Sequence, residues 1–331
     1  MKYQKIGKTG PEVSRIGFGC WALGGDSHYG KVDDTEADRA IHRAIDLGVT
    51  LFDTAPVYGF GASEGFLGRS LGKQREDIVL LTKGGHTWDP VTTTRKPDAR
   101  YSSLKQGLDD SLRRLGTDYV DIFLLHWPDP GTPAEETMRA LNEMVSEGKI
   151  RHIGVCNHDG YELREAAQFA PIIANEVGYN MLDRRWEAEM FPAARDIGAS
   201  IIAYGAMGHG LLTGTFQRDQ TLEPGDWRES GWIFGQQLLG PNLSANLDVV
   251  DELMLVAESI DTTLPRMALA WVLRDPLVAV ALAGVRASNE IEENVKAVDI
   301  ELPADVLAKI DAALDRVVGR SEVVPGARRP R

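Results

Sequence analysis

Short apolar runs rich in β-branched residues alternate with amphipathic segments along most of the chain. These runs are almost continuously apolar rather than alternating, so they predict strands of a parallel sheet that is covered by helices. Eight of them follow one another, at residues 16–25, 49–55, 77–85, 118–129, 150–157, 172–180, 199–207 and 277–286.

The segments between the runs carry the periodicity of helices. Residues 35–48 place apolar side chains on or near one face and stop at Gly48, which suits a C-cap. Residues 103–115 repeat the pattern with four leucines. Thr132, followed by Pro133 and two glutamates, predicts an N-cap with proline at the first helical position.

Eight strand–helix units in one chain favour an α/β fold closed into a (β/α)8 TIM barrel. An open doubly wound sheet is the structural alternative. It predicts a G-x-G-x-x-G turn after the first strand, and the glycines there, at positions 17, 19, 24 and 25, lack that spacing.

Three segments stand outside the strand–helix pattern, although the whole chain, residues 1–331, is expected to form one domain. Residues 1–15, with a Lys-Thr-Gly-Pro turn, predict a β-hairpin before the barrel. Residues 208–247, after the seventh run, predict a long loop of functional importance. Residues 317–331 predict a flexible tail.

The bulk composition excludes some classes of partner. The 331 residues are 43% hydrophobic, which suffices for a sizeable core, and the formal net charge is −13. Such a charge disfavours nucleic acids and anionic membrane surfaces. The start of the chain lacks the apolar core of a signal peptide, and no run approaches the ~20 residues of a membrane span, so we expect a cytoplasmic protein. Cys20 and Cys156 lie in apolar stretches and are expected to be buried thiols.

Four polar residues lie at or just after successive predicted strands: Asp53, Tyr58, Lys83 and His126. Catalytic groups of a TIM barrel gather at the carboxyl ends of its strands. Together these residues suit proton transfer to a carbonyl oxygen during hydride transfer. An ammonium beside a phenol favours the phenolate, a carboxylate holds the ammonium in place, and an imidazole polarises the carbonyl.

Each of these residues taken alone has an ordinary structural explanation. Asp53 suits a helix cap, Lys83 a solvated surface position and His126 a strand end. The combination of all four at successive strand ends favours an active site over these separate explanations.

The motifs around these positions resemble the aldo-keto reductase superfamily. FDTAPVYGFGASEGFLG at residues 52–68 resembles the signature around the catalytic aspartate and tyrosine. LLTKGG (80–85), DIFLLHWPDP (121–130), YGAMGHGLLTG (204–214) and GVRASNEIEEN (284–294) resemble later motifs of the family, in the family's order. The phrase LHWPDP and the loop containing GDWR are most similar to a bacterial branch of inositol-catabolism and general-stress oxidoreductases.

The resemblance implies a role for each matching position. Tyr58 is the implied general acid and base, tuned by Lys83 and Asp53, with His126 orienting the carbonyl. Asn157 and Glu176 are implied to hold the nicotinamide carboxamide, and Tyr204 to stack on its ring. The implied contacts to the rest of the cofactor are Gly205, Met207, Gly210, Leu211, Gly284, Arg286, Glu290, Glu293 and Asn294.

Three positions depart from the family's pattern: Cys156 replaces a serine, Glu176 a glutamine, and Glu290 a glutamine or arginine. If ionised, Glu176 can only accept hydrogen bonds, so Asn157 must then donate to the carboxamide carbonyl. Arg286 suits the 2′-phosphate of NADP, whereas Glu290 repels phosphate and suits NAD. The balance favours NADP, with NAD as the alternative, and Glu290 facing outward is also compatible with the sequence.

The remaining candidates are histidines and tryptophans near strand ends. His28, His86 and His209 lack the spacing of metal ligands, so no metal is expected. Trp21, Trp88 and Trp127 are expected to wall an apolar or sugar-stacking substrate pocket, unless some of them belong to the core.

The predicted function is therefore that of an NAD(P)-dependent oxidoreductase, which reversibly reduces an aldehyde or ketone to the alcohol. A sugar is one candidate substrate. One alternative is a sugar or polyol dehydrogenase that works oxidatively with NAD, because its residues are the same. Another is a non-catalytic redox-sensing subunit similar to potassium-channel β subunits of the superfamily, which the direct start of the chain at the hairpin disfavours. The sequence leaves the substrate and the oligomeric state open.

Overall fold

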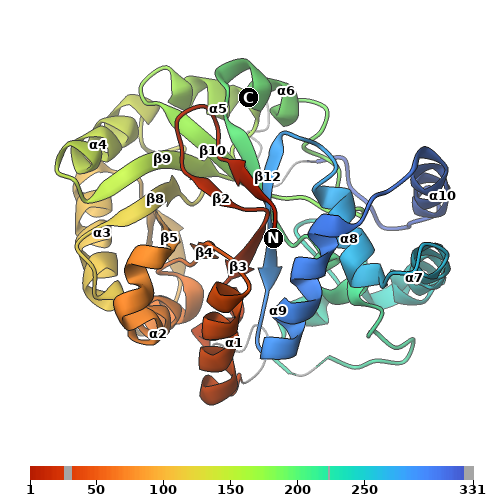
Figure 1. The fold of residues 1–331 in the computed structure, drawn as a ribbon. Helices are drawn as coiled ribbons and strands as arrows, with labels where there is room; N and C mark the ends of the chain where they lie inside the picture. The colour runs from red at the N-terminus through yellow and green to blue at the C-terminus, as the bar shows by residue number, and fades with distance from the viewer. Residues whose placement is uncertain (26–31, 223, 324–331) are drawn as a thin grey trace.

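Eight parallel strands close into a barrel, with helices around its outside (Figure 1). This computed structural model describes residues 1–25, 32–222 and 224–323. Neighbouring strands follow chain order, and the last strand pairs with the first. The fold confirms the predicted TIM barrel and all eight predicted strands, with trimmed ends: β3 (Ile16–Gly19), β4 (Leu51–Asp53), β5 (Val79–Gly84), β8 (Val120–Leu125), β9 (Ile150–Cys156), β10 (Ile172–Gly178), β11 (Ser200–Tyr204) and β12 (Val278–Gly284).

Ten α-helices are described, and most follow a barrel strand. They are α1 (Asp34–Asp46), α2 (Ala62–Leu71), α3 (Tyr101–Leu115), α4 (Ala134–Ser146), α5 (Gly160–Ala167), α6 (Met190–Ile197), α7 (Leu243–Glu258), α8 (Leu264–Val272), α9 (Ser288–Asn294) and α10 (Ala304–Leu314). Short 3-10 turns connect them: η1 (Trp21–Gly24), η2 (Tyr58–Gly61), η3 (Gly72–Asp77), η4 (Gly208–Thr213), η5 (Trp227–Ser230), η6 (Gly240–Asn242) and η7 (Val295–Asp299). None of the described helices is long and apolar enough to cross a membrane.

The predicted helix ends are partly right. Helix α1 stops two residues before Gly48, whose φ of 82° is the left-handed conformation expected after a helix. The predicted N-cap at Thr132 is wrong, because Pro133 occupies the cap position and α4 begins at Ala134. The Thr132 hydroxyl instead donates to the Asp129 carboxylate at 2.7 Å, which closes the loop before the helix.

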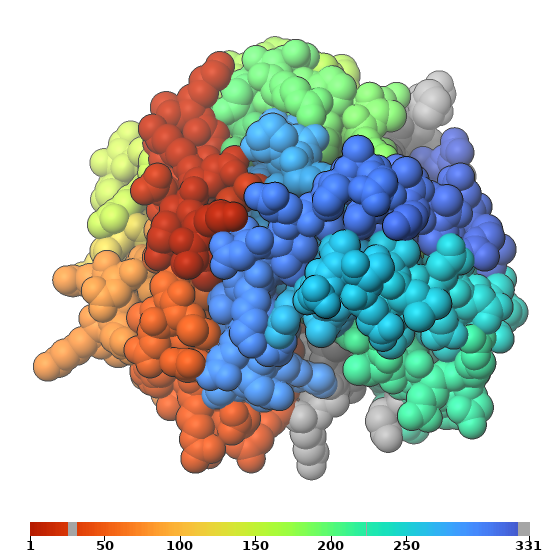
Figure 2. Space-filling model, turned by 45° about the vertical axis from the view of Figure 1, so that its right-hand side comes forward, coloured from red at the N-terminus to blue at the C-terminus, as the bar shows by residue number. Residues whose placement is uncertain are grey.

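An amino-terminal hairpin covers the amino ends of the barrel strands. Its strands β1 (Tyr3–Lys5) and β2 (Glu12–Ser14) are antiparallel, which confirms the hairpin predicted for residues 1–15. Ile6 and Val13 are fully buried and join the apolar cluster inside the barrel. Lys2 Nζ also donates to the carbonyl of Val298 at 2.6 Å, so the start of the chain lies beside its last third, as the red and blue surfaces of Figure 2 show.

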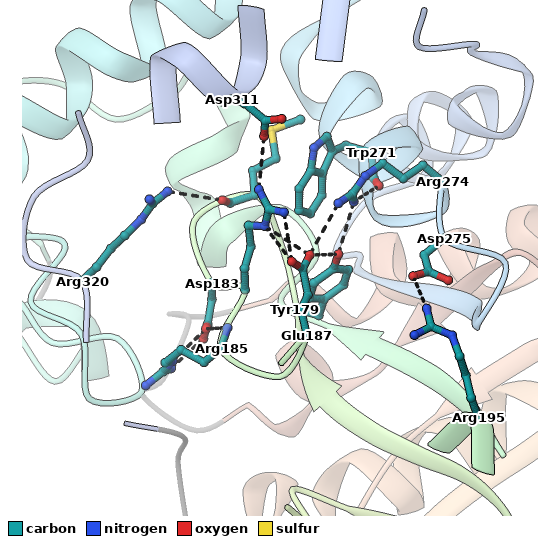
Figure 3. Close-up of polar contacts among 12 residues, drawn as sticks. Tyr179, Asp183, Arg185, Glu187, Arg195, Trp271, Arg274, Asp275, Asp311 and Arg320 are labelled. Carbon is teal, nitrogen blue, oxygen red and sulfur yellow. Dashed lines mark hydrogen bonds and ion pairs between the residues drawn. The ribbon is translucent and has the colours of Figure 1, made fainter. Parts of the chain in front are cut away.

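The loop after β10 is fixed by a polar cluster around Tyr179, three residues beyond Glu176 (Figure 3). The Tyr179 hydroxyl donates to Glu187 at 2.6 Å and accepts from Arg274 at 3.2 Å. The Arg274 guanidinium stacks 3.5 Å from the centre of the Trp271 ring, which belongs to α8. These contacts hold the start of the loop after β10 against α8.

The carboxyl ends of the barrel strands carry two further structures. A second hairpin of β6 (His86–Trp88) and β7 (Arg95–Pro97) follows β5. The segment predicted as a loop over residues 208–247 contains η4, η5 and η6, and it ends where α7 begins at Leu243, earlier than predicted. Its length places many side chains over the mouth of the barrel.

Candidate active site

Lys83 lies at the centre of a buried polar cluster. Its side chain is fully buried near the carboxyl end of β5. The ammonium donates to the Asp53 carboxylate, to the carbonyl of Thr54 at 3.3 Å and to the Tyr58 hydroxyl at 3.0 Å. The explanation of Lys83 as a solvated surface residue is therefore wrong, since only a charge with close partners is tolerated at this depth.

The neighbouring carboxyl and phenol have shifted acidities. Burial raises the pKa of Asp53, and the Lys83 ammonium opposes this rise. Burial also raises the pKa of the Tyr58 phenol well above its ordinary value, and Lys83 again acts in the opposite direction. Tyr58 therefore keeps its proton at neutral pH, while a cation stands beside the oxygen that would become charged on losing it.

Tyr58 begins the turn η2, whose shape depends on Gly59. Gly59 has a φ of 59°, and a Cβ at this position would lie 1.8 Å from the carbonyl oxygen of Gly24. No other residue fits against that backbone, so the G-rich signature after Tyr58 has a steric reason. The close approach of η1 and η2 fixes the phenol over Lys83.

His126 follows β8 and faces Tyr58 with its ring edge-on, the ring centres 5.9 Å apart. Its side chain is almost entirely buried, and within the described part of the chain its Nδ1 has no hydrogen-bond partner. Burial, assisted by Lys83, His86 and Arg95, lowers the pKa of His126 well below its usual range. The imidazole is therefore neutral and offers one N–H.

Asn157, Glu176 and Tyr204 lie at the ends of the next three strands. Asn157 adopts a left-handed φ of 58°, and its side-chain oxygen accepts from the Tyr204 hydroxyl at 2.8 Å. Its amide nitrogen donates to the carbonyl of His126 at 3.3 Å and to the sulfur of Cys156 at 3.1 Å. The amide expected to hold a cofactor carboxamide is thus already engaged with neighbouring strands.

Glu176 belongs to the same cluster, which the sequence did not indicate. Its Oε1 lies 3.3 Å from Lys83 Nζ, and its side chain is 2% exposed. Burial and the nearby Asp53 raise the pKa of Glu176 to about 8, with Lys83 acting in the opposite direction. At neutral pH this residue is therefore a carboxylic acid that can donate as well as accept, unlike the ionised group considered from the sequence.

A cavity of about 1080 Å³ opens above these residues. The catalytic candidates Asp53, Tyr58 and His126 line it, as do Trp21 and Trp127. The predicted cofactor residues that line it are Asn157, Glu176, Tyr204, Gly205, Met207, Gly210, Gly284, Arg286, Glu290, Glu293 and Asn294. The structure therefore brings most residues of the two predicted sets into one continuous space, while Lys83 is buried beside it and contacts Asp53 and Tyr58.

The family model described as "Aldo/keto reductase family" matches residues 15–315. The chain belongs to this family. It is consequently an NAD(P)-dependent oxidoreductase, and its barrel is that of an aldo-keto reductase.

Three individual proteins agree with the assignment of the chain as an aldo-keto reductase. The chain is 35% identical over 332 residues to the NADH-specific methylglyoxal reductase of Escherichia coli (strain K12), covering 96% of this chain and 100% of that protein. It is 35% identical to the aldo-keto reductase YhdN of Bacillus subtilis (strain 168), covering 88% and 87%. The solved structure of a glycerol dehydrogenase from Gluconobacter oxydans superposes with a TM-score of 0.86 at 32% identity, covering 96% of each chain.

Two predicted site residues of this aldo-keto reductase lie elsewhere. Trp88 is not among the described residues that line the cavity, because the β6–β7 hairpin turns its ring onto Phe60, with 5.7 Å between ring centres. Leu211 is fully buried in the core between barrel and helices, so its side chain cannot reach the cavity. Any contact that Leu211 makes with a cofactor is restricted to its backbone.

The long segment supplies an aromatic wall that sequence reasoning did not assign. Trp227 lies 5.7 Å from Trp21 and 5.5 Å from Phe234, measured between ring centres. His209 packs between Trp227 and Phe234 at 5.3 and 5.1 Å, and burial lowers the pKa of His209 to about 3. This side of the cavity is therefore formed by aromatic rings and a neutral imidazole. The concentration of tryptophan and phenylalanine in an otherwise polar loop was the available signal.

The backbone after β11 packs closely against the His209 ring. Gly205 has a φ of 61°, and a Cβ there would meet His209 Nε2 at 2.4 Å. Arg228 from η5 also lines the cavity and donates to the carbonyl of His209 at 2.9 Å. The sequence drew attention to the GDWR stretch but did not place its arginine at the site.

Arg286 and Glu290 contact each other at the far end of the cavity. Glu290 accepts from the Arg286 backbone N–H at 2.7 Å, and one guanidinium nitrogen lies 3.4 Å from its other oxygen. Glu290 thus lies against Arg286 and lines the cavity, and its contact with the adenosine end of a cofactor stays a prediction. Glu293, on the same helix, pairs with Lys296 at 2.6 Å and also contacts Arg266.

The residues present fit a nicotinamide cofactor. Glu176 Oε2 is buried and has no hydrogen-bond partner within the described ranges, yet its residue lines the cavity. Such an atom costs free energy unless a ligand satisfies it, and a carboxamide provides both a donor and an acceptor. Tyr204 beside it offers an aromatic face, so the pair suits the nicotinamide end of the cofactor.

Among the described residues there is no cluster of three potential metal ligands. His86 lines the cavity, and burial lowers its pKa to about 4. His28 lies outside the described residues. Cys20 and Cys156 are both buried free thiols, as predicted.

Proposed function

We propose that the protein reversibly reduces an aldehyde or ketone to the alcohol, with Tyr58 as the proton donor. The observation that carries this proposal is the buried series Asp53–Lys83–Tyr58, in which Lys83 Nζ lies 3.0 Å from the phenol oxygen. The nicotinamide, when bound, supplies a hydride to the carbonyl carbon. A residue of the chain must therefore deliver the proton to the carbonyl oxygen.

Tyr58 suits this role because it is both protonated and close to a fixed cation. Burial keeps its pKa high, so the proton is present at neutral pH. As the proton leaves, charge develops on an oxygen that already accepts a hydrogen bond from Lys83. A preorganised cation in a site shielded from water stabilises such developing charge without reorganisation. Asp53 keeps the ammonium in position.

His126 is proposed to polarise the carbonyl. The neutral imidazole cannot compete with Tyr58 as a strong acid, but its N–H can donate to an oxygen that approaches Tyr58. The edge-on arrangement of the two rings places both donors on one side of the cavity. A carbonyl oxygen between them would receive one hydrogen bond from each residue.

The proposed substrates are small polar carbonyl compounds and the corresponding alcohols. Trp21 and Trp227 lie close together near Tyr58, with Trp21 6.0 Å from the Tyr58 ring centre, and they narrow the approach to the phenol. The narrowed approach favours short chains, and the indole faces suit the apolar faces of polyols. A methylglyoxal reductase and a glycerol dehydrogenase among the similar proteins both act, by their names, on three-carbon compounds.

A turnover screen tests this proposal. Purified protein is assayed with methylglyoxal, dihydroxyacetone and glyceraldehyde, with longer aldoses, and with glycerol and larger polyols in the oxidative direction, each with NAD(H) and NADP(H). We expect turnover of at least one three-carbon compound, with a lower kcat/KM for five- and six-carbon aldoses. Exclusive turnover of polyols would favour the oxidative alternative, and no turnover at all would contradict the proposal.

The choice between NADP and NAD is proposed to depend on Glu290. Its carboxylate holds the Arg286 backbone N–H and guanidinium, which is the group that suits a 2′-phosphate. A bound 2′-phosphate would have to compete with this carboxylate for Arg286 and would also be repelled by it. Glu290 is therefore expected to lower the affinity for NADPH more than that for NADH.

We expect Glu290→Gln to raise the ratio of kcat/KM for NADPH to that for NADH by about tenfold, or ~1.4 kcal/mol. Glutamine preserves an oxygen for the Arg286 backbone N–H and removes only the charge. Steady-state kinetics with both cofactors and one carbonyl measure the ratio. Glu292→Gln is the matched control, because Glu292 lies on the same helix and pairs with Arg43 at 2.7 Å. An unchanged ratio in Glu290→Gln would show that this carboxylate does not influence cofactor choice.

A further inference from the structure

Two carboxyl groups share a single ammonium at the bottom of the cavity. Asp53 Oδ1 contacts Lys83 Nζ, Glu176 Oε1 lies 3.3 Å from the same nitrogen, and the two carboxyls influence each other's pKa. All three side chains are at most 5% exposed. If both acids were ionised, the cluster would carry a net negative charge in a region with little water, which is unfavourable. One proton shared between the carboxyls gives a neutral cluster.

The groups around Glu176 indicate that the shared proton resides on Glu176 rather than on Asp53. The titratable groups that face Glu176 come from five elements of the barrel wall: Asp53 (β4), Tyr58 (η2), Lys83 (β5), Cys156 (β9) and Tyr204 (β11). Burial raises the pKa values of the thiol and of both phenols well above their ordinary values, so these groups are neutral near pH 7. Lys83 is the one cation among the five, and Asp53 is the carboxyl that contacts it directly.

The second oxygen of Glu176 provides an independent observation that points to a ligand. Oε2 is buried and has no hydrogen-bond partner within the described part of the chain, although Glu176 lines the cavity beside Tyr58 and Tyr204. A carboxyl that belongs to a proton-sharing cluster and also lines a binding site can change its charge when the ligand changes charge. The family's glutamine at this position has no such capacity.

We propose that Glu176 is a carboxylic acid when the reduced nicotinamide is bound and a carboxylate when the oxidised, cationic nicotinamide is bound, so that it sets the relative affinity for the two forms. The inference rests on the proposed function, which places the reacting end of the cofactor near Tyr58. Lys83 connects the two residues, because its Nζ lies 3.0 Å from the Tyr58 hydroxyl and 3.3 Å from Glu176 Oε1. The added positive charge of the oxidised ring is balanced by loss of one proton from Glu176 to solvent through the cavity.

Binding measurements on the wild-type protein test this inference without turnover. Dissociation constants for NAD⁺ and NADH, and in parallel for NADP⁺ and NADPH, are determined from pH 6 to 9. Comparing the two oxidation states of the same dinucleotide cancels the titration of its phosphates. We expect the ratio Kd(oxidised)/Kd(reduced) to fall by up to about tenfold per pH unit between the pKa of Glu176 in the oxidised complex and its higher pKa in the reduced complex, and to be level outside that interval.

Calorimetry in buffers of different ionisation enthalpy counts the protons directly. At pH 7 we expect binding of the oxidised form to release up to one proton more than binding of the reduced form. Equal proton release for the two forms, together with a ratio that does not change with pH, would overturn the inference.

Variants identify the group that titrates. Glu176→Gln keeps the size and one acceptor oxygen but cannot ionise, so its ratio is expected to be independent of pH. Cys156→Ser, at the adjacent buried thiol, is expected to keep the wild-type pH dependence. A full pH dependence in Glu176→Gln would exclude Glu176 as the source.

Two further measurements keep the test decisive. If Glu176→Gln does not fold, infrared difference spectra of the wild-type protein replace it. The loss of a carboxylic-acid C=O band on changing from the reduced to the oxidised cofactor is expected, and its persistence would contradict the inference. Tyr58→Phe separates this inference from the proposed function, because its pH-dependent binding is expected to remain while its turnover is lost.

Discussion

Tyr58→Phe is expected to lower kcat for carbonyl reduction by roughly 10²–10⁴-fold while leaving the Kd for the reduced cofactor within about twofold. Phenylalanine retains the ring that packs beside Trp21 and His126 but removes the O–H that receives a hydrogen bond from Lys83. The carbonyl oxygen would then have no acid at the position where its charge develops. Steady-state kinetics and fluorescence titration of cofactor binding measure the two quantities.

Two outcomes would identify a different acid. If Tyr58→Phe retains more than about a tenth of the wild-type kcat, another group delivers the proton. If its residual activity instead shows a new pH dependence that disappears in the double variant with His126→Gln, the imidazole is the substitute acid. Tyr179→Phe is the matched control, because it removes a phenol oxygen that donates to Glu187 outside the cavity. Its turnover is expected to stay near the wild-type value.

The barrel and the meeting of the candidate residues could be predicted from the sequence, because both follow from local patterns. Apolar runs of strand length recur eight times, and a parallel barrel brings the carboxyl ends of all strands to one rim. Asp53, Lys83 and His126 had to meet there once the strand order was known. Gly59 marks a second local signal, since its close packing against Gly24 accounts for the glycines that follow Tyr58.

What the sequence could not predict depends on the directions of individual side chains. Trp88 lies near a strand end, but the antiparallel hairpin that carries it turns its ring away from the cavity. Leu211 lies within a cofactor motif, yet its side chain is buried behind that motif. Trp227 is distant in sequence from Trp21, and only the path of the long segment brings the two rings together.

The charge state of Glu176 is a second property that sequence patterns do not reveal. From the sequence, this residue replaces a glutamine and is a simple acceptor when ionised. The structure places it against the same ammonium as Asp53, and burial next to another carboxyl makes it a protonated acid. Such coupling depends on distances among three strands, which no single motif contains.

Lys83→Met is expected to lower kcat by about 10²–10⁴-fold and the free energy of unfolding by about 3–5 kcal/mol near pH 8. Methionine fills a similar volume but leaves Asp53 and Glu176 side by side without a cation. Both carboxyls already have raised pKa values in the folded protein, and removal of Lys83 raises them further. The loss of kcat follows because the phenolate of Tyr58 also loses its neighbouring charge.

The pH dependence of stability distinguishes this explanation from a simple packing defect. An acid whose folded pKa exceeds its unfolded pKa binds more protons in the folded state, so the free energy of unfolding falls as pH rises between those two values. For wild-type Glu176 this interval extends from its ordinary pKa near 4.5 to about 8. In Lys83→Met the fall in the free energy of unfolding should be larger and continue beyond pH 8, whereas a packing defect would reduce stability equally at all pH values.

Urea unfolding at pH 6, 7.5 and 9 measures this difference. Lys149→Met is the control, because its half-exposed ion pair with Asp109 is worth less than about 1 kcal/mol. Parallel stability curves for Lys83→Met and wild type would mean that the two buried carboxyls do not depend on this ammonium.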